Sequence, residues 1–220
     1  LKKIFFYLGY KIVRENNFND RWKDQIVECE EEDYKNILQA LDYALCGKEN
    51  LWSLIQSIKY VADKKISGDF VECGVFRGGS LGILSQYSEK YSLDCKIYGF
   101  DTFEDGFFNT PISEKDITIK GEQIKPEKKI DNFYPTKQEV ENNLKKFFTN
   151  KKYSPILIKG DVLKTLQEPK NIPTKISILR LDTDLYLTTK LQLEVLFPKL
   201  VSGGILHIDD YGICPGVRTA

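Results

Sequence analysis

Two pairs of aspartates are the residues best placed to do chemistry. Asp182 and Asp184 follow an aliphatic run in ILRLDTDLY, and Asp209 and Asp210 follow another in GGILHIDDYG. Carboxylates at the end of a buried strand are costly unless their charge is compensated. A hard cation such as Mg2+, which prefers oxygen ligands, would remove the repulsion between them. The alternative is neutralisation by basic side chains, namely Arg180, Arg218 or lysines. We favour the metal, because the two acidic pairs occupy corresponding strand ends.

A glycine-rich turn, VECGVFRGGS, is the second candidate. Glycines between a strand and a helix let the backbone approach a ligand, and the helix presents its first amides to a negative group. The spacing of Gly74, Gly78 and Gly79 matches neither the dinucleotide GxGxxG pattern nor a phosphate-binding loop. A tight strand-to-helix turn without a ligand is the alternative.

Two more aspartates end predicted strands. Asp101, in YGFDTFEDG, could accept hydrogen bonds from ribose hydroxyls, and its alternative role is a helix or turn cap. Asp161, in KGDV, has the same ambiguity, because it also fits the N-cap of the helix that follows.

The elements that position these residues follow from the hydrophobic pattern. Apolar residues at helical spacing predict helices over residues 32–46 and 50–64. Strands are predicted at 69–75, 95–101, 155–161, 175–182 and 203–210, and helices from Ser80 on and at 136–148, 161–167 and 187–200. This alternation predicts an α/β fold with a doubly wound parallel sheet. Ligands bind beyond the carboxyl ends of such strands, so the aspartates should meet in one crevice.

Residues 102–135 interrupt the alternation with a long stretch rich in Lys, Glu, Asp and Phe. A loop of that length is usually a functional lid or disordered. Its mixed charges leave a solvated excursion as the alternative to a substrate lid.

Composition excludes several classes. With 41% hydrophobic residues, the 220-residue chain can bury the core of one domain plus a small extension. Lys plus Arg and Asp plus Glu both number 32, which argues against nucleic acid as a partner.

Five scattered cysteines without a CxxC pair disfavour a disulfide framework and favour the cytoplasm. The apolar start LKKIFFYLGYKIV is too short to span a bilayer, so we expect no transmembrane span, and it could form a homo-oligomer contact.

His207 is the only histidine, and we favour a packed strand residue over a catalytic one. Cys73 is expected to be buried packing rather than a nucleophile.

Four segments, GDFVECGVFRGGS, YGFDTFEDG, LRLDTDLY and FPKLVSGGILHIDDYG, resemble in order and spacing the TylF-type macrocin O-methyltransferase family. The resemblance runs from about residue 51 to the end. It implies a class I, Rossmann-like methyltransferase fold that uses S-adenosylmethionine (SAM), with an N-terminal helical extension in residues 1–50 and the methyltransferase domain in 51–220. The chain ends at Ala220, and we expect it to lack the C-terminal hairpin that completes this fold.

The resemblance also implies cofactor-binding positions. The turn after the first strand would hold the methionine end of SAM, Asp101 the ribose, and Asp161 the adenine neighbourhood. The full set is Glu72, Cys73, Gly74, Arg77, Gly78, Gly79, Ser80, Asp101, Thr102, Phe103 and Asp161.

The acidic pairs gain separate roles from the resemblance. Asp182, Asp209 and Asp210 match the family's metal-binding positions. Asp184, the second acid of L-D-x-D, is the candidate general base, so Asp182 and Asp184 are the expected catalytic residues.

The implied activity is transfer of a methyl group from SAM to a hydroxyl of a sugar or polyol, assisted by Mg2+, on a small-molecule or glycan acceptor. One alternative is a non-catalytic member of the family that serves as a binding or assembly partner in glycan or natural-product biosynthesis. Another is a nicotinamide-dependent oxidoreductase, which the missing GxGxxG disfavours.

Overall fold

The computed structural model describes residues 28–106, 110–125 and 133–220. The apolar start considered above lies outside these residues. None of the helices in the described part of the chain is long and apolar enough to cross a membrane.

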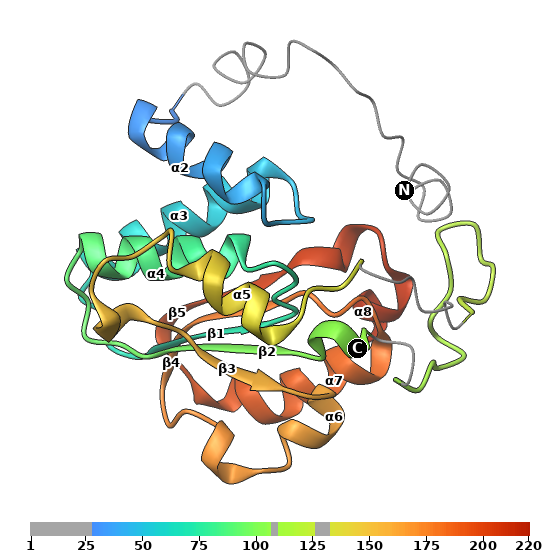
Figure 1. Cartoon of the computed structure of the whole chain (residues 1–220). Helices are drawn as coiled ribbons and strands as arrows, with labels where there is room; N and C mark the ends of the chain where they lie inside the picture. Colours follow the sequence, from blue (N-terminus) through green and yellow to red (C-terminus); the bar gives the residue numbers. More distant parts are fainter. Residues whose placement is uncertain (1–27, 107–109, 126–132) are drawn as a thin grey trace, which may run out of the picture.

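Five parallel strands form one twisted sheet (Figure 1). They are β1 Asp69–Cys73, β2 Ile97–Asp101, β3 Ile156–Lys159, β4 Ile176–Leu181 and β5 Leu200–Ile208. Their order in the sheet is β3-β2-β1-β4-β5, so the direction in which strands are added reverses between β1 and β4. This confirms the predicted doubly wound sheet and places the expected ligand crevice at the carboxyl ends of β1 and β4.

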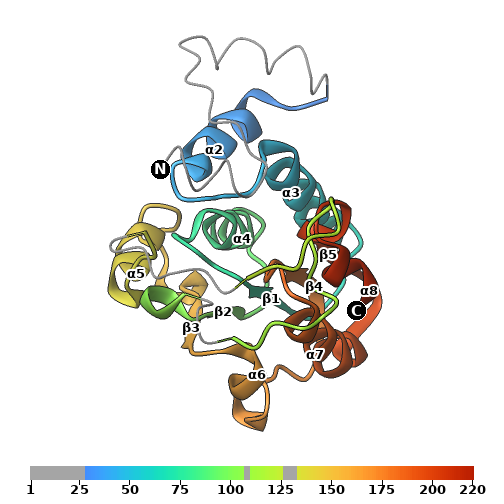
Figure 2. The same ribbon diagram turned by 90° about the vertical axis from the view of Figure 1, so that its right-hand side faces the viewer.

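Helices cover both faces of the sheet (Figures 1 and 2). One face carries α2 Glu31–Leu41, α3 Lys48–Asp63, α4 Gly79–Lys90 and α5 Lys137–Leu144. The other carries α6 Val162–Thr165 and α7 Tyr186–Leu196. The short helix α8 Pro215–Thr219 packs on α7 after the 3-10 turn Asp209–Gly212.

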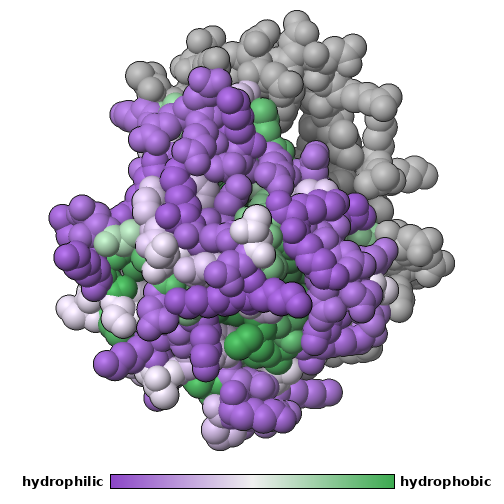
Figure 3. Space-filling model, turned by 60° about the vertical axis from the view of Figure 1, so that its left-hand side comes forward, coloured by the Kyte–Doolittle hydropathy of each residue, from purple (hydrophilic) through white to green (hydrophobic). Residues whose placement is uncertain are grey.

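Strand alternation divides the core between the two faces. Phe70 and Ile178 point to the face with α3 and α4, and Val71 and Leu179 point to the face with α6 and α7. All four are fully buried. The surface view in Figure 3 is mostly hydrophilic, with small separate hydrophobic areas, as expected for a domain whose apolar side chains fill these two clusters.

Three helices end four or five residues earlier than predicted. The helix predicted at 187–200 ends at Leu196, because a 3-10 turn containing Pro198 follows and β5 starts at Leu200. Proline lacks the amide that an α-helix needs there. The helix predicted at 32–46 ends at Leu41, and the one predicted at 136–148 ends at Leu144.

The first helices are integrated with the sheet domain. The predicted division after residue 50 falls inside α3, and Ile37 and Ala40 of α2 belong to the same buried cluster as Phe70 of β1. The division into an extension and a domain stays a prediction. The described part of the 102–135 insertion contains a 3-10 turn, Phe103–Asp105, and an antiparallel bridge between Ile117 and Gln123.

Candidate active site

The carboxyl ends of the strands bring the predicted residues into one row. Across the sheet order, the row runs from Asp161 after β3 to Asp101 at the end of β2, the turn after β1, and the acids after β4 and β5. Parallel strands all end at the same edge, so residues distant in sequence become neighbours. The structure therefore brings the two predicted groups, cofactor-binding and metal-binding, to one edge.

Asp182, Asp209 and Asp210 form the acidic cluster of this edge. Each offers a carboxylate oxygen, and these oxygens lie within 4.8 Å of one another. Asp210 is only 6% exposed, and the side chains of Asp182 and Asp209 are 26% and 14% exposed. β4 and β5 are hydrogen-bonded neighbours, and this pairing puts the acids side by side.

The cluster fits a hard divalent cation. Asp210 Oδ2 is buried and accepts no hydrogen bond. Burial, followed by the nearby Asp184 and Asp209 carboxylates, raises the pKa of Asp210 to about 8. Burial also raises the pKa of Asp182 well above its usual range, in spite of Arg180 beside it. Crowded buried carboxyls bind protons when no cation is present, and an all-oxygen set of this kind suits Mg2+.

Asp184 differs from these three acids. It is exposed and has a left-handed backbone, with φ of 59°. A carboxylate oxygen of Asp184 lies within 4.8 Å of one of Asp210. An accessible carboxylate at the rim of the cluster can exchange a proton with a bound molecule, as a general base must.

Arg180 forms some of the salt bridges that were considered as the alternative to a metal ion. Its buried guanidinium lies 2.7 Å from Asp182 Oδ2, 2.8 Å from Glu72 Oε1 and 3.1 Å from Asp209 Oδ1. Arg218, the other arginine considered, instead donates to the carbonyl oxygens of Tyr211 and Gly212. One arginine therefore contacts the cluster that the sequence assigned to a metal.

The turn after β1 is tightly packed against protein. Gly74 and Gly78 have φ of +91° and +94°, and Phe76 has φ of 49°. A Cβ on Gly74 would lie 1.8 Å from the carbonyl oxygen of Asp182. Side chains of α5 flank Gly78 and the backbone of α2 flanks Gly79. These glycines allow close chain approach, and their role toward a cofactor stays a proposal.

Glu72 is fully buried beneath this turn. Its Oε1 accepts hydrogen bonds from Ser80 Oγ, 2.5 Å away, and from Arg180 Nη1, whereas Oε2 is buried without a hydrogen-bond partner. Burial raises the pKa of Glu72 to about 6, against the opposing effects of Arg180 and Ser80. One oxygen of this acid thus lacks the hydrogen bond that a buried carboxylate normally accepts.

Asp101 organises the loops at the end of β2. Its Oδ2 accepts the amides of Val75 and Phe76, at 2.6 and 2.8 Å, and its Oδ1 accepts the amide of Phe103 at 2.6 Å. Burial raises the pKa of Asp101, and these three amides oppose the rise. Asp101 therefore caps the turns after β1 and β2, which was the alternative role considered for it. Its contact with a ribose stays a proposal.

The remaining predicted positions surround these residues. Asp161 caps α6 through the Leu163 amide, and its other oxygen accepts a hydrogen bond from Thr110 Oγ1. Thr102 directly precedes the 3-10 turn Phe103–Asp105, and Phe103 is buried in it. Arg77 is exposed, and Cys73 is buried as packing, as predicted.

Comparison with known proteins decides the family. A profile of the macrocin-O-methyltransferase (TylF) family matches residues 8–220. The chain belongs to this family of O-methyltransferases. The match begins well before residue 51, so it includes most of the N-terminal segment that the motifs did not reach.

Similar proteins include the demethyldecarbamoylnovobiocin O-methyltransferase of Streptomyces niveus, which is 27% identical over 185 residues. The alignment covers 81% of this chain and 66% of that enzyme, so the chain spans just under two thirds of its relative.

Solved structures agree in fold. The O-methyltransferase NovP superposes with a TM-score of 0.63 at 23% identity, covering 81% of this chain and 71% of NovP. CalS11, a TDP-rhamnose 3'-O-methyltransferase, gives 0.56 at 22% identity, covering 98% of this chain and 86% of CalS11. These neighbours confirm the class I SAM-dependent methyltransferase fold.

Three residues beside the acidic cluster were not predicted. Asn50 of α3 donates a hydrogen bond to Asp209 Oδ1. Cys214 offers its sulfur within 4.8 Å of oxygens of Asp184 and Asp210. Asp116 of the insertion is fully buried and accepts the amide of Tyr186, the first residue of α7, at 2.6 Å. Polar residues on other elements carry no motif, so only the tertiary contacts reveal them.

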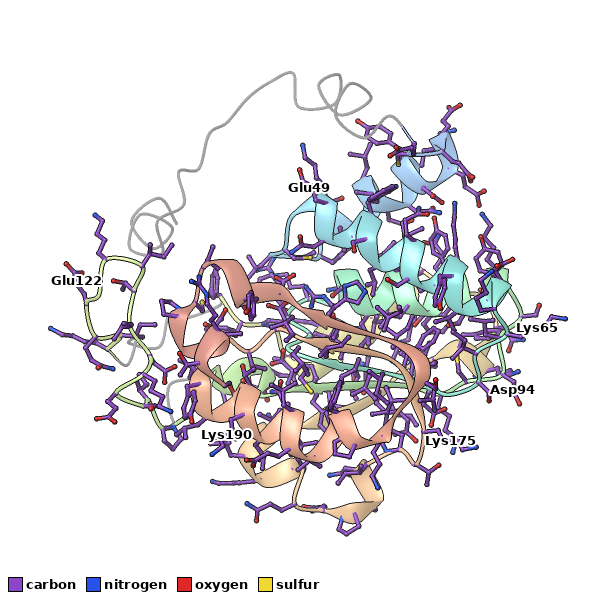
Figure 4. All side chains as sticks on the ribbon, turned by 180° about the vertical axis from the view of Figure 1, so that it is seen from behind. Glu49, Lys65, Asp94, Glu122, Lys175 and Lys190 are labelled. Atoms are coloured by element: carbon purple, nitrogen blue, oxygen red, sulfur yellow. The ribbon has the colours of Figure 1, made fainter. Side chains whose placement is uncertain are left out.

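The insertion also lies at this end of the molecule. Figure 4 shows Glu122 of the insertion at one end of the molecule, and Lys65, Asp94 and Lys175 at the opposite end. Thr110 and Asp116 connect the insertion to Asp161 and to Tyr186, after β3 and β4 respectively. Part of the insertion, for which a lid and a solvated excursion were both considered, is thus anchored beside the candidate site.

Proposed function

We propose that the chain is a SAM-dependent O-methyltransferase that methylates a hydroxyl of a sugar or polyol moiety, assisted by Mg2+. The observation that carries this proposal is the acidic cluster of Asp182, Asp209 and Asp210 next to the turn after β1, within a chain that belongs to an O-methyltransferase family. CalS11 acts on TDP-rhamnose, and the novobiocin-type relative on another small molecule. These relatives favour a sugar-bearing small molecule or glycan as the acceptor.

Each side of the site has a separate task. The turn after β1 and the loops after β2 and β3 hold SAM, and Glu72 Oε2, buried and without a hydrogen-bond partner, suits the amino group of its methionine end. Bound there, SAM would supply the methyl group to the acceptor oxygen and would leave as S-adenosylhomocysteine, and the residues of this turn and these loops would set its orientation toward the acceptor.

The acceptor hydroxyl needs help to lose its proton. Asp182, Asp209 and Asp210 would hold Mg2+, which lowers the pKa of a hydroxyl that it binds. Asp184, at the exposed rim of the cluster, accepts the proton as the carbon–oxygen bond forms. In this proposal Asp182 is a metal ligand and Asp184 is the general base.

Tritiated SAM offered with a panel of nucleotide sugars and glycosides tests the proposal. We expect methyl transfer that requires Mg2+, a loss of at least 100-fold for Asp182→Ala and Asp184→Asn, and unchanged SAM binding by calorimetry for both variants. Asp94→Asn, at the opposite end of the sheet, is the matched control and should behave as wild type.

Two outcomes contradict the proposal. If titration with SAM produced no heat, SAM would be rejected as the cofactor. If Asp182→Ala kept full activity with Mg2+, the proposed metal site would be rejected. SAM binding without turnover on any acceptor would instead favour the non-catalytic alternative.

A further inference from the structure

Arg180 occupies the middle of a polar row that crosses three strands. Strand register pairs it with Glu72 of β1 on one side and with His207 of β5 on the other. Residues paired in register point to the same face. All three side chains therefore lie on the face that α3 and α4 cover, where Ser80 of α4 contacts Glu72 and Ser57 of α3 contacts His207.

The arginine is enclosed, yet it contacts acids of all three strands. It is 2% exposed. Nη1 donates hydrogen bonds to Glu72 Oε1 and Asp182 Oδ2, at 2.8 and 2.7 Å, whereas Nη2 forms an ion pair with Asp209 Oδ1 at 3.1 Å without hydrogen-bond geometry. Asp182 follows Arg180 by two residues on the same face of the strand, so one extended side chain reaches along β4 as well as across to β1 and β5.

No other basic group among the described residues pairs with these three acids. His207 is the strand neighbour of the arginine, and its Nε2 lies 2.9 Å from Ser57 Oγ on α3. A planar guanidinium can hold several carboxylates at once in fixed directions, which a lysine ammonium cannot.

We propose that Arg180 is a positioning residue that fixes the carboxylates of Asp182 and Asp209 in the arrangement that a divalent cation requires. It contacts neither cation nor acceptor and acts through its hydrogen bond and ion pairs with the acids. Partners of this kind orient ligating carboxylates, and their loss typically weakens metal binding by about 10–100-fold. The inference rests on the proposed metal site.

Binding of Mn2+, read from the loss of the free-ion electron paramagnetic resonance signal, tests the inference without any acceptor. Arg180→Lys keeps the positive charge but cannot span three acids, and Arg180→Gln removes the charge. We expect both to bind Mn2+ about 10–100-fold more weakly than wild type, with Gln the weaker. Lys190→Gln is the matched control, because it removes an exposed positive charge whose ion pair is with Glu194 of the same helix, and it should stay within about twofold.

Thermal unfolding without metal separates positioning from a general structural role. The inference is overturned if Arg180→Lys unfolds at a lower temperature than the wild type but binds Mn2+ equally well or more tightly. In that case the arginine only fills the core or competes with the cation. If Arg180→Gln does not fold, the lysine variant decides. Wild-type protein that binds no Mn2+ would instead reject the proposed metal site itself.

Discussion

Substitution of Gly74 by alanine tests how closely the two halves of the site are joined. The backbone at Gly74 has φ of +91°, and a Cβ there would lie 1.8 Å from the carbonyl oxygen of Asp182. The same contact region contains the hydrogen bond from the Asp182 amide to the Cys73 carbonyl, at 2.9 Å. Gly121, with φ of +81° and no atom within 4 Å of its would-be Cβ, provides a matched control.

The two variants should differ by the cost of the contact alone. A left-handed conformation costs a residue with a Cβ about 1–2 kcal/mol, and both variants bear this cost. Only Gly74→Ala also forces the backbone of β4 away, and overpacking of this kind costs about 1–3 kcal/mol more. We expect Gly74→Ala to lower the free energy of unfolding by about 2–5 kcal/mol, against about 1–2 kcal/mol for Gly121→Ala.

Urea unfolding of both variants measures this difference, and Mn2+ titration measures its effect on the site. Because the added methyl group pushes directly on Asp182, we expect Gly74→Ala also to bind Mn2+ more weakly, while Gly121→Ala binds as wild type. Equal losses of stability in the two variants, or unchanged Mn2+ affinity in Gly74→Ala, would refute the reasoning.

Three further outcomes follow from single side chains. The pKa of His207 is lowered from 6.5 to about 4, first by burial, so the contribution of His207 to stability should fall by about 3 kcal/mol as the pH drops from 6.5 to 4. The raised pKa values of Glu72, Asp182 and Asp210 act in the opposite direction, so the measurement is the difference in free energy of unfolding between the wild type and His207→Gln in urea titrations, in which the wild type should lose about 3 kcal/mol relative to the variant. Asp101→Asn places an NH2 group against either the Val75 and Phe76 amides or the Phe103 amide, so it should weaken SAM binding, measured by calorimetry, while lowering stability by about 1–3 kcal/mol. Asp116→Ala removes the acceptor of the Tyr186 amide and should lower the unfolding midpoint and expose the insertion to limited proteolysis.

The sequence predicted the fold well because the relevant signals are local. Buried strands such as Ile176–Leu181 alternate with helices, and this pattern leaves few topologies. Boundaries were less accurate where a local signal competes with the pattern. Pro198 ended a helix that apolar spacing had extended to residue 200.

The candidate site was predictable only in part. Asp182 and Asp209 could be placed together because parallel strands end at one edge. The donation from Asn50 to Asp209 could not, because it depends on how α3 packs over β5. Asp101 was placed correctly at its strand end, but the three amides that occupy its oxygens depend on a turn whose shape the sequence does not reveal.

A metal ion and an arginine need not exclude each other at the strand ends. Arg180 contacts three acids, yet Asp210 still has a buried oxygen without a partner and a pKa raised to about 8. One guanidinium carries a single positive charge, whereas Glu72, Asp182, Asp209 and Asp210 carry four negative charges when ionised. Either protons or a divalent cation must therefore neutralise the remainder. The arginine makes a charged cluster tolerable within the fold, and the remaining negative charge is the basis for expecting the cluster to bind Mg2+ as well.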